Sequence, residues 1–333
     1  MLTRHVSGRT YNYEYCIGRQ AAGGAGFIIP IDFAVGSNRS LYVVSRGSEF
    51  SPSLGITKCT LDHEVIWEDR GLTFAGGQSP WPNSVDIDSE ESVFISDDHT
   101  GRISIYDRDG NYQGAWGTKG SGDGELNSPS GLAFDAEDSL LIVDSLNNRI
   151  QKFTRDGKLL GKWGSQGSGE GQFNMPWGMS IDKDGYVYVA DWKNDRIQKF
   201  TPDGEFIATF GSPGSGDGEL HRPTDVAIDE QGDVYVADWG NLRLNIYQAD
   251  GTFITSFIGD ADTLSPWAQG VVDANPDYRK ARRRTDMTLE QRFQRPVAVY
   301  VDDEGRIMVS ETQRARIQIY VKERDFIDAQ FNL

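Results

Sequence analysis

The chain has 333 residues, 38% of them hydrophobic, and is long enough to bury a large core without disulfides or metal ions. Its 50 acidic and 33 basic residues give a formal net charge of −17, which opposes binding to polyanions such as nucleic acids. It has no apolar run of about 18 residues, as a membrane helix would need, and no apolar stretch near its start that would suggest a secretory signal. We therefore expect a cytoplasmic protein that binds neither nucleic acids nor membranes.

A closing strand is predicted near the start of the chain, at residues 10–18, where YNYEYCIG has the pattern of a strand followed by an exit loop. Residues 325–331 compete for the same role. The rest of the chain consists of six copies of one pattern, and the middle copies are 47 residues apart. The copies begin at Pro30, Pro82, Pro129, Pro176, Pro223 and Pro296.

Each copy contains four short runs of alternating apolar residues separated by turn formers, most clearly between residues 179 and 210. The pairs Asp184-Gly185 and Asp203-Gly204 suit tight hairpins, because glycine accepts a positive φ at little cost. Four antiparallel strands repeated at a fixed period are typical of a propeller blade. The sequence therefore predicts an all-β, six-bladed β-propeller formed by residues 1–333 as a single domain.

The longest departure from the period is an insertion at residues 260–295, between the fifth and sixth copies. Residues 275–293 within it contain good helix formers, with Pro276 suited to a first turn. We expect this helical insertion to form a lid across the mouth of the ring. The alternative is a helix docked on the rim without a function.

Residues 164–176 and 211–223 share the pattern GSxGSGxGxxxxP. The strand sequence RIQKF precedes each of these segments, and the strand sequence VYVAD follows each of them. These sequences resemble the NHL repeat family. The resemblance covers nearly the whole chain and implies a six-bladed propeller with a central channel. Such propellers include both enzymes and interaction scaffolds, so the fold alone does not imply a function.

In a propeller of this type, the inner strands begin at the prolines, and we call that side of the ring the proline face. An Asp at the end of the second strand and an Arg at the start of the third recur in several copies, as in Asp191 and Arg196. We interpret these pairs as structural. The glycine-rich connectors lack a following Lys-Ser/Thr and helix, so they are turns and not phosphate loops.

Residues that break the repeat at the proline face are the candidates for function. His99 is the candidate general acid or base and Arg46 the candidate anion clamp, while Asp98 or Glu311 would orient the base or hold a metal. Aromatic walls with a few polar groups are typical of a ligand pocket, although the same residues could be rim packing. The candidate substrate-binding residues are Trp81, Asn83, Trp177, Trp192, Trp239 and Trp267.

Arg46-Gly47 is also distantly similar to a strand-ending Arg-Gly of the peptidyl-α-hydroxyglycine amidating lyase propellers. That resemblance implies zinc ligands directly after the blade prolines, but no histidine occupies those positions here. Asp32 and Asp225, two residues after their prolines, are candidate ligands for a structural Ca²⁺. We expect no organic cofactor, since no nucleotide fingerprint is present, and we leave open a divalent ion, either Ca²⁺ or a transition metal.

Two functional hypotheses remain. The first is a small-molecule enzyme, a lyase or hydrolase that uses acid–base chemistry at the mouth of the channel. The second is a non-catalytic scaffold that binds another protein. A basic cluster at residues 279–284 is interpreted as a solvated helix face that pairs with the acidic body.

Overall fold

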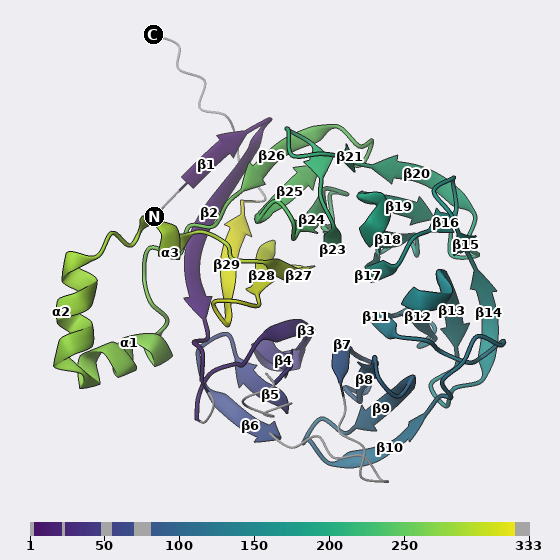
Figure 1. The fold of residues 1–333 in the computed structure, drawn as a ribbon, viewed down its shortest axis with the longest axis horizontal. Helices are drawn as coiled ribbons and strands as arrows, with labels where there is room; N and C mark the ends of the chain where they lie inside the picture. The colour runs from purple at the N-terminus through teal and green to yellow at the C-terminus, as the bar shows by residue number, and fades with distance from the viewer. Residues whose placement is uncertain (1–2, 22–23, 48–54, 70–80, 324–333) are drawn as a thin grey trace.

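The computed structural model describes residues 3–21, 24–47, 55–69 and 81–323. Its strands form six antiparallel sheets arranged around a central axis, as Figure 1 shows. The prediction of an all-β, six-bladed propeller is confirmed. In every blade the inner strand begins at the predicted proline, and in blades one to five the strands follow in sequence from the axis to the rim. None of the helices in the described part of the chain is long and apolar enough to cross a membrane.

The first three blades contain the following strands, from the inside outward. Blade one has β3 (Pro30–Gly36), β4 (Ser40–Ser45), β5 (Gly55–Thr60) and β6 (Val65–Asp69); blade two has β7 (Pro82–Ile87), β8 (Val93–Asp97), β9 (Arg102–Tyr106) and β10 (Tyr112–Trp116); blade three has β11 (Pro129–Phe134), β12 (Leu140–Asp144), β13 (Arg149–Phe153) and β14 (Leu159–Trp163).

The last three blades continue the series, and short parallel pairs brace two of the connectors. Blade four has β17 (Pro176–Ile181), β18 (Val187–Asp191), β19 (Arg196–Phe200) and β20 (Phe206–Phe210); blade five has β23 (Pro223–Ile228), β24 (Val234–Asp238), β25 (Arg243–Tyr247) and β26 (Phe253–Phe257); blade six has β27 (Pro296–Val301), β28 (Arg306–Glu311), β29 (Arg316–Lys322), β2 (Arg9–Ile17) and β1 (Thr3–Val6). The braces are β15 (Ser165–Gln166) with β16 (Gln172–Phe173), and β21 (Ser212–Pro213) with β22 (Glu219–Leu220).

The N-terminal strand closes the ring. β2 pairs antiparallel with β29, so the predicted closing strand at residues 10–18 is confirmed. An ion network next to this seam ties it to blade five. Arg9 lies 2.5 Å from Asp233, and Lys322 lies 2.7 Å from the same carboxylate. The competing segment, residues 325–331, lies outside the described residues.

The core of the propeller lies between neighbouring blades, where the facing sheets bury aliphatic and aromatic side chains. Between blades four and five, for example, Tyr188, Phe210 and Val236 are at most 1% exposed. Burying each such side chain contributes roughly 1.5–3 kcal/mol. The alternation of apolar residues in each strand therefore fixes which face of the sheet meets the neighbouring blade.

A buried carboxylate clamp holds each of four blades to its preceding connector. In blade four, Asp191 Oδ2 accepts from Arg196 Nε at 2.9 Å, and Arg196 Nη2 donates to the connector carbonyls of Gly169 and Gln172 at 2.7 and 2.9 Å. Burial raises the pKa of Asp191, and hydrogen bonds from Asn174, Asn194 and Arg196 oppose that rise. The other clamps are Asp144 with Arg149, Asp238 with Arg243, and Glu311 with Arg316.

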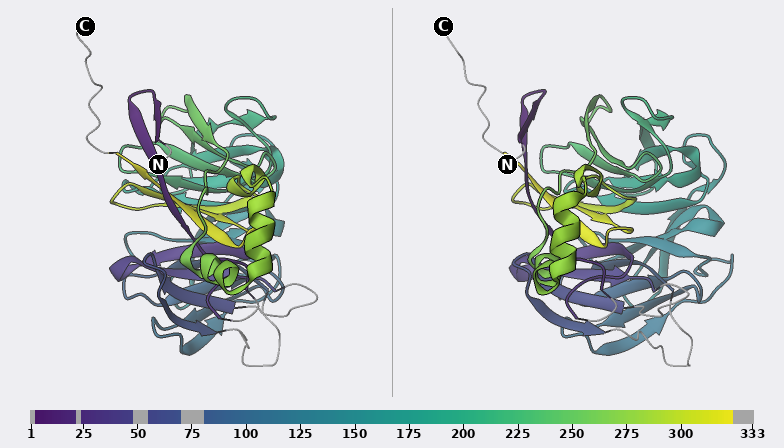
Figure 2. Two further views of the ribbon diagram at one scale, coloured as in Figure 1. Left: turned by 90° about the vertical axis from the view of Figure 1, so that its left-hand side faces the viewer. Right: turned by 60° about the vertical axis from the view of Figure 1, so that its left-hand side comes forward.

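The insertion after blade five forms three helices: α1 (Pro266–Ala274), α2 (Pro276–Arg284) and α3 (Thr288–Gln291). They lie outside the ring, beside blades six and one, in Figures 1 and 2. The predicted lid across the mouth is therefore wrong, and the helical character is correct. The Ser265 hydroxyl, which caps α1, donates to Gly18 O at 2.5 Å, and Trp267 Nε1 donates to His63 O at 2.9 Å. These contacts hold the insertion against the outer surface.

We expect Arg196→Met to lower the free energy of unfolding by about 3–5 kcal/mol, because it leaves the buried Asp191 carboxylate without its cation. Urea unfolding followed by circular dichroism measures this change. Arg283→Met, on the exposed face of α2, is the matched control and should change stability by less than about 0.5 kcal/mol. A cost below about 1 kcal/mol for Arg196→Met would contradict a stabilising role for the clamp.

Candidate functional site

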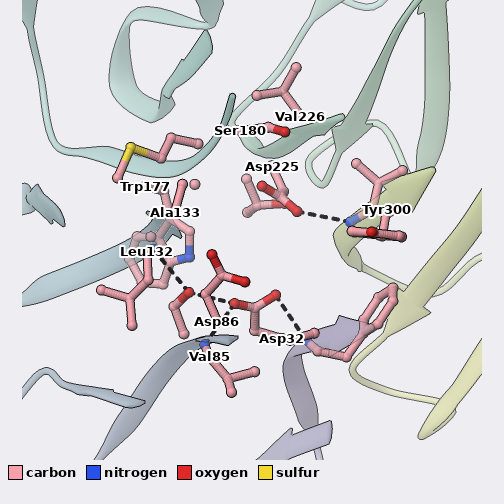
Figure 3. Close-up of a pocket in the computed structure, with 18 of the residues that line it drawn as sticks. Asp32, Val85, Asp86, Leu132, Ala133, Trp177, Ser180, Asp225, Val226 and Tyr300 are labelled. Atoms are coloured by element: carbon pink, nitrogen blue, oxygen red, sulfur yellow. Dashed lines mark hydrogen bonds between the residues drawn. The ribbon is translucent and has the colours of Figure 1, made fainter. Parts of the chain in front are cut away.

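A cavity of about 330 Å³ runs along the axis of the ring. Its lining comes from the inner strands of all six blades. Three of the lining side chains are aspartates: Asp32 on β3, Asp86 on β7 and Asp225 on β23. Figure 3 shows the three carboxyl groups directed into the same space. The channel therefore concentrates acidic groups from blades that are far apart in the sequence.

Each of these aspartates also joins its blade to the next one. Asp32 Oδ2 accepts from Ser84 Oγ at 2.5 Å and from Val85 N at 3.0 Å. Asp86 Oδ2 accepts from Phe134 N, and Asp225 Oδ2 accepts from Val299 N, both at 2.9 Å. These carboxylates satisfy backbone N–H groups that the inner strands leave unpaired toward the axis.

Burial raises the pKa of all three carboxyl groups, because the protein displaces the water that would stabilise their charge. The pKa of Asp32 rises to about 6 and that of Asp86 to about 7, against opposing hydrogen bonds from backbone N–H groups. The pKa of Asp225 is raised well above its ordinary value, first by burial and then by the charge of Asp32. Asp32 and Asp225 thus influence each other's protonation, because the charge of one disfavours the ionised form of the other.

The described residues do not arrange a metal site in the channel. No group of three or more His, Cys, Asp or Glu side chains within them is placed to hold a metal ion. Asp32 accepts three hydrogen bonds, including one from Phe33 N at 2.8 Å, so both of its carboxylate oxygens have protein partners. The expected Ca²⁺ between Asp32 and Asp225 therefore stays a prediction, and we derive no chemistry from it.

Arg46 reaches the proline face as predicted and bridges blades one and two. Its Nε donates to Pro82 O at 2.8 Å, and its Nη2 donates to Asn83 Oδ1 at 2.6 Å. Nη2 also lies 3.7 Å from Asp98 Oδ2, and the guanidinium lies 5.6 Å from the centroid of the Trp81 ring. Burial lowers the pKa of Arg46. The structure thus gathers four of the predicted site residues at one point of the rim.

The predicted aromatic wall is also present on the opposite side of the ring. Trp177 lines the channel, and its ring centroid lies 6.3 Å from that of Trp192. Trp239 occupies the position in blade five that Trp192 occupies in blade four, directly after the second strand. Trp267 does not belong to this wall, because it packs near Phe27 and His63 on the outside of the ring.

Two predicted catalytic side chains are placed away from the channel. His99 is exposed, and its backbone N–H donates to Asp97 Oδ1 at 2.9 Å. Glu311 is fully buried, with hydrogen bonds from Arg316, Gln294 N and Gln318 Nε2. Its carboxylate therefore serves the blade-six clamp. Neither residue lines the axial cavity.

Sequence reasoning overlooked Asp86, although it carries a signal. It occupies the fourth position after a blade proline, where three other blades have Ala34, Ala133 and Ala227. A charged residue at a position that is otherwise small breaks the repeat as clearly as Arg46 does. Tyr300 breaks the same position in blade six, and the charge of Asp86 contributes to raising its pKa.

Comparisons with known proteins agree with this architecture. Residues 121–217 match the family described as SMP-30/Gluconolactonase/LRE-like region, and residues 220–247 match the NHL repeat. No curated protein matches the chain.

Among solved structures, a protein of unknown function from Bacteroides thetaiotaomicron is 18% identical, with a TM-score of 0.64 over 95% of this chain and 76% of that one. A streptogramin B lyase is 11% identical, with a TM-score of 0.59 over 94% and 98%. A catalytically inactive virginiamycin B lyase from Staphylococcus aureus, solved with quinupristin, is 13% identical, with a TM-score of 0.56 over 88% and 94%. At these identities the likeness concerns the fold.

We expect the free energy of unfolding to fall as the pH rises through about 7, with Asp86 contributing to the fall. Because its pKa is higher in the folded than in the unfolded chain, its stabilising contribution is complete below about pH 4 and is lost as it ionises. Asp86→Ala should make the difference in stability between pH 5 and pH 8 smaller, as measured by urea unfolding. Alanine at this position is compatible with the blade, because three other blades contain it.

Asp107→Ala is the matched control, because Asp107 lies in an outer hairpin away from the channel and hydrogen bonds from Asn111 lower its pKa. It should leave the difference between pH 5 and pH 8 unchanged. If Asp86→Ala and the native chain showed the same difference, the assignment of a raised pKa to Asp86 would be wrong.

Proposed function

This chain is a six-bladed propeller of the NHL-repeat type, and we propose that it is an acid–base hydrolase or lyase that acts on a small molecule in its axial channel. The observation that carries the proposal is the pair Asp32 and Asp225. The two carboxyl groups face one cavity, and burial raises the pKa of both, with the charge of Asp32 raising that of Asp225 further. Two coupled carboxyl groups in one cavity do not readily ionise together, so one can serve as the base while the other keeps its proton and serves as the acid.

The proposed roles follow from the two environments. Asp32 has a pKa of about 6, so it is mainly ionised at neutral pH and acts as the base. Asp225 keeps its proton, because burial and the neighbouring charge of Asp32 both disfavour its ionised form, and it acts as the acid. After each turnover Asp32 is protonated and Asp225 is ionised. Return of one proton from Asp32 to Asp225 restores the starting state of both groups.

A cyclic ester is the substrate that we propose to test first. Asp32 would take a proton from water, the water oxygen would attack the ring carbonyl, and the ring C–O bond would break. Asp225 would give its proton to the departing alkoxide. The description of the matched family names gluconolactonase, and two structural neighbours are lyases, which supports this class of reaction. Arg46 remains the proposed oxyanion or anion stabiliser at the rim.

The alternative of a non-catalytic scaffold has no specific observation in its favour. The exposed apolar side chains Ile66, Leu160 and Ile207 lie on the outermost strands of three different blades, and Val271, Tyr278 and Leu289 lie on the three separate helices of the insertion. Apolar side chains scattered over a surface in this way are ordinary in soluble proteins.

We expect the protein to open glucono-1,5-lactone or a related sugar lactone, with kcat/KM rising as the pH increases through about 6. Asp32→Asn and Asp225→Asn should each lower kcat/KM by roughly 10²–10⁴-fold, because each removes one proton-transfer group. A pH-indicator assay corrected for spontaneous hydrolysis measures the rate. Asp107→Asn, on an outer hairpin, is the control and should retain full activity. Equal activity in Asp32→Asn and the native chain would exclude the proposed base.

A further inference from the structure

The rim of the proline face contains three arginine–tryptophan pairs in equivalent places. At three junctions between blades, the residue after the second strand of one blade contacts the residue before the proline of the next. In each of these contacts an arginine guanidinium stacks over a tryptophan indole ring, at distances to the ring centroid of 4.6–5.6 Å. The pairs are Arg46 with Trp81, Arg222 with Trp192, and Arg295 with Trp239.

The order of the two residues is exchanged in one pair. At the junction of blades one and two, the arginine follows the strand and the tryptophan precedes the proline. At the junctions of blades four and five and of blades five and six, the arginine precedes the proline. The arginine–tryptophan contact is therefore present in both arrangements, although the two residue types have exchanged positions. Duplication of an ancestral repeat would have kept each residue type at the same position, so it does not explain this exchange. A function of the rim in placing arginines over flat rings explains it.

Two of the three arginines have free hydrogen-bond donors. Arg222 and Arg295 are exposed, and neither side chain has a hydrogen bond or ion pair with another residue in the described ranges. A guanidinium stacked on an aromatic ring keeps its in-plane N–H groups available. Arg46 differs, because Pro82 O and Asn83 Oδ1 already accept from it.

One of the two exposed arginines, Arg222, lies close to the axial channel. Arg222 covers Trp192, and Trp192 lies beside Trp177, which lines the cavity. The positive φ of Arg222 and of Arg295, 54° and 59°, marks the turn that brings the chain into each inner strand.

The carboxylates near this rim are engaged by other groups. Asp195 Oδ1 accepts from Arg222 N at 2.6 Å and lies 3.6 Å from His221 Nδ1. Asp98 accepts from Ser128 Oγ and lies 3.7 Å from Arg46. Asp195 therefore places a carboxylate beside Arg222, but neither it nor Asp98 occupies the guanidinium N–H groups of Arg222 or Arg295.

We propose that the proline-face rim recognises the anionic group, a carboxylate or a phosphate, of a small molecule whose remainder enters the channel. Arg222 and Arg295 bind the anion through their free N–H groups, and Trp177 and Trp192 contact the apolar part. Planar guanidinium groups suit both anions, because two parallel hydrogen bonds can form to either. This inference rests on the proposed function for the location of the ligand and adds the chemical class of the substrate.

Isothermal titration with three naphthalene derivatives of one shape tests the proposal. The compounds are 2-naphthoate, 2-naphthyl phosphate and the uncharged 2-naphthamide. We expect at least one anion to bind about tenfold more tightly than the amide at low ionic strength, the effect of one charge-assisted hydrogen bond. The two anions distinguish a carboxylate site from a phosphate site. Added salt should reduce the advantage of the anion, because both arginines are exposed to solvent.

Substitutions locate the site. Arg222→Gln and Arg295→Gln should each reduce anion binding and leave the weak binding of the amide unchanged, while Arg222→Lys should restore part of the loss. Arg283→Gln makes the same change of charge on the outer helix α2 and should have no effect. Equal binding of the anions and the amide, or equal losses in Arg283→Gln and Arg222→Gln, would overturn the proposal.

The same titrations separate this inference from the proposed reaction. Asp32→Asn and Asp225→Asn should keep the preference for the anion while losing lactone turnover. A protein that prefers the anion but opens no lactone would overturn the proposed reaction alone. A protein that opens lactones but shows no preference for the anion would overturn the rim proposal alone.

Discussion

The whole ring depends on a buried carboxylate at the end of the second strand of a blade. Asp191 receives hydrogen bonds from the backbone of its connector and from Arg196, which in turn holds two connector carbonyls. A buried charge of this kind is tolerated only when its partners are complete. The clamp therefore fixes the path of the chain from one blade to the next, and it places the residues beside it at the proline face.

The channel is a consequence of that arrangement. Because the clamps and the apolar faces hold the six inner strands around one axis, side chains from all six blades share a single cavity. Asp32, Asp86 and Asp225 use their carboxylates to satisfy neighbouring strands, and the same burial raises the pKa of each. Structural hydrogen bonding and acid–base capability thus come from one set of residues, in contrast to Glu311, whose carboxylate serves only a clamp.

Departures from the repeat predicted the rim better than they predicted the channel. Arg46, Asn83 and Trp177 were identifiable because they replace different residues at equivalent positions, and a repeat gives each position a fixed place in the ring. His99 was misleading, since a residue can break the pattern and still point to solvent. Trp267 lies in an insertion that has no counterpart in the other blades, so the repeat provides no information about where it packs.

The amino-acid sequence by itself determined the number of blades, the proline at which each begins and the Asp–Arg pairs, because each of these is a local pattern repeated along the chain. It also indicated the closing strand through its alternation of apolar residues. Only the tertiary structure decided that the Asp32 carboxylate accepts from Ser84 of the next blade, that α1 and α2 lie outside the ring, and that Arg222 covers Trp192. These relations join residues of different blades, so they depend on how the sheets close around the axis, which no local pattern encodes.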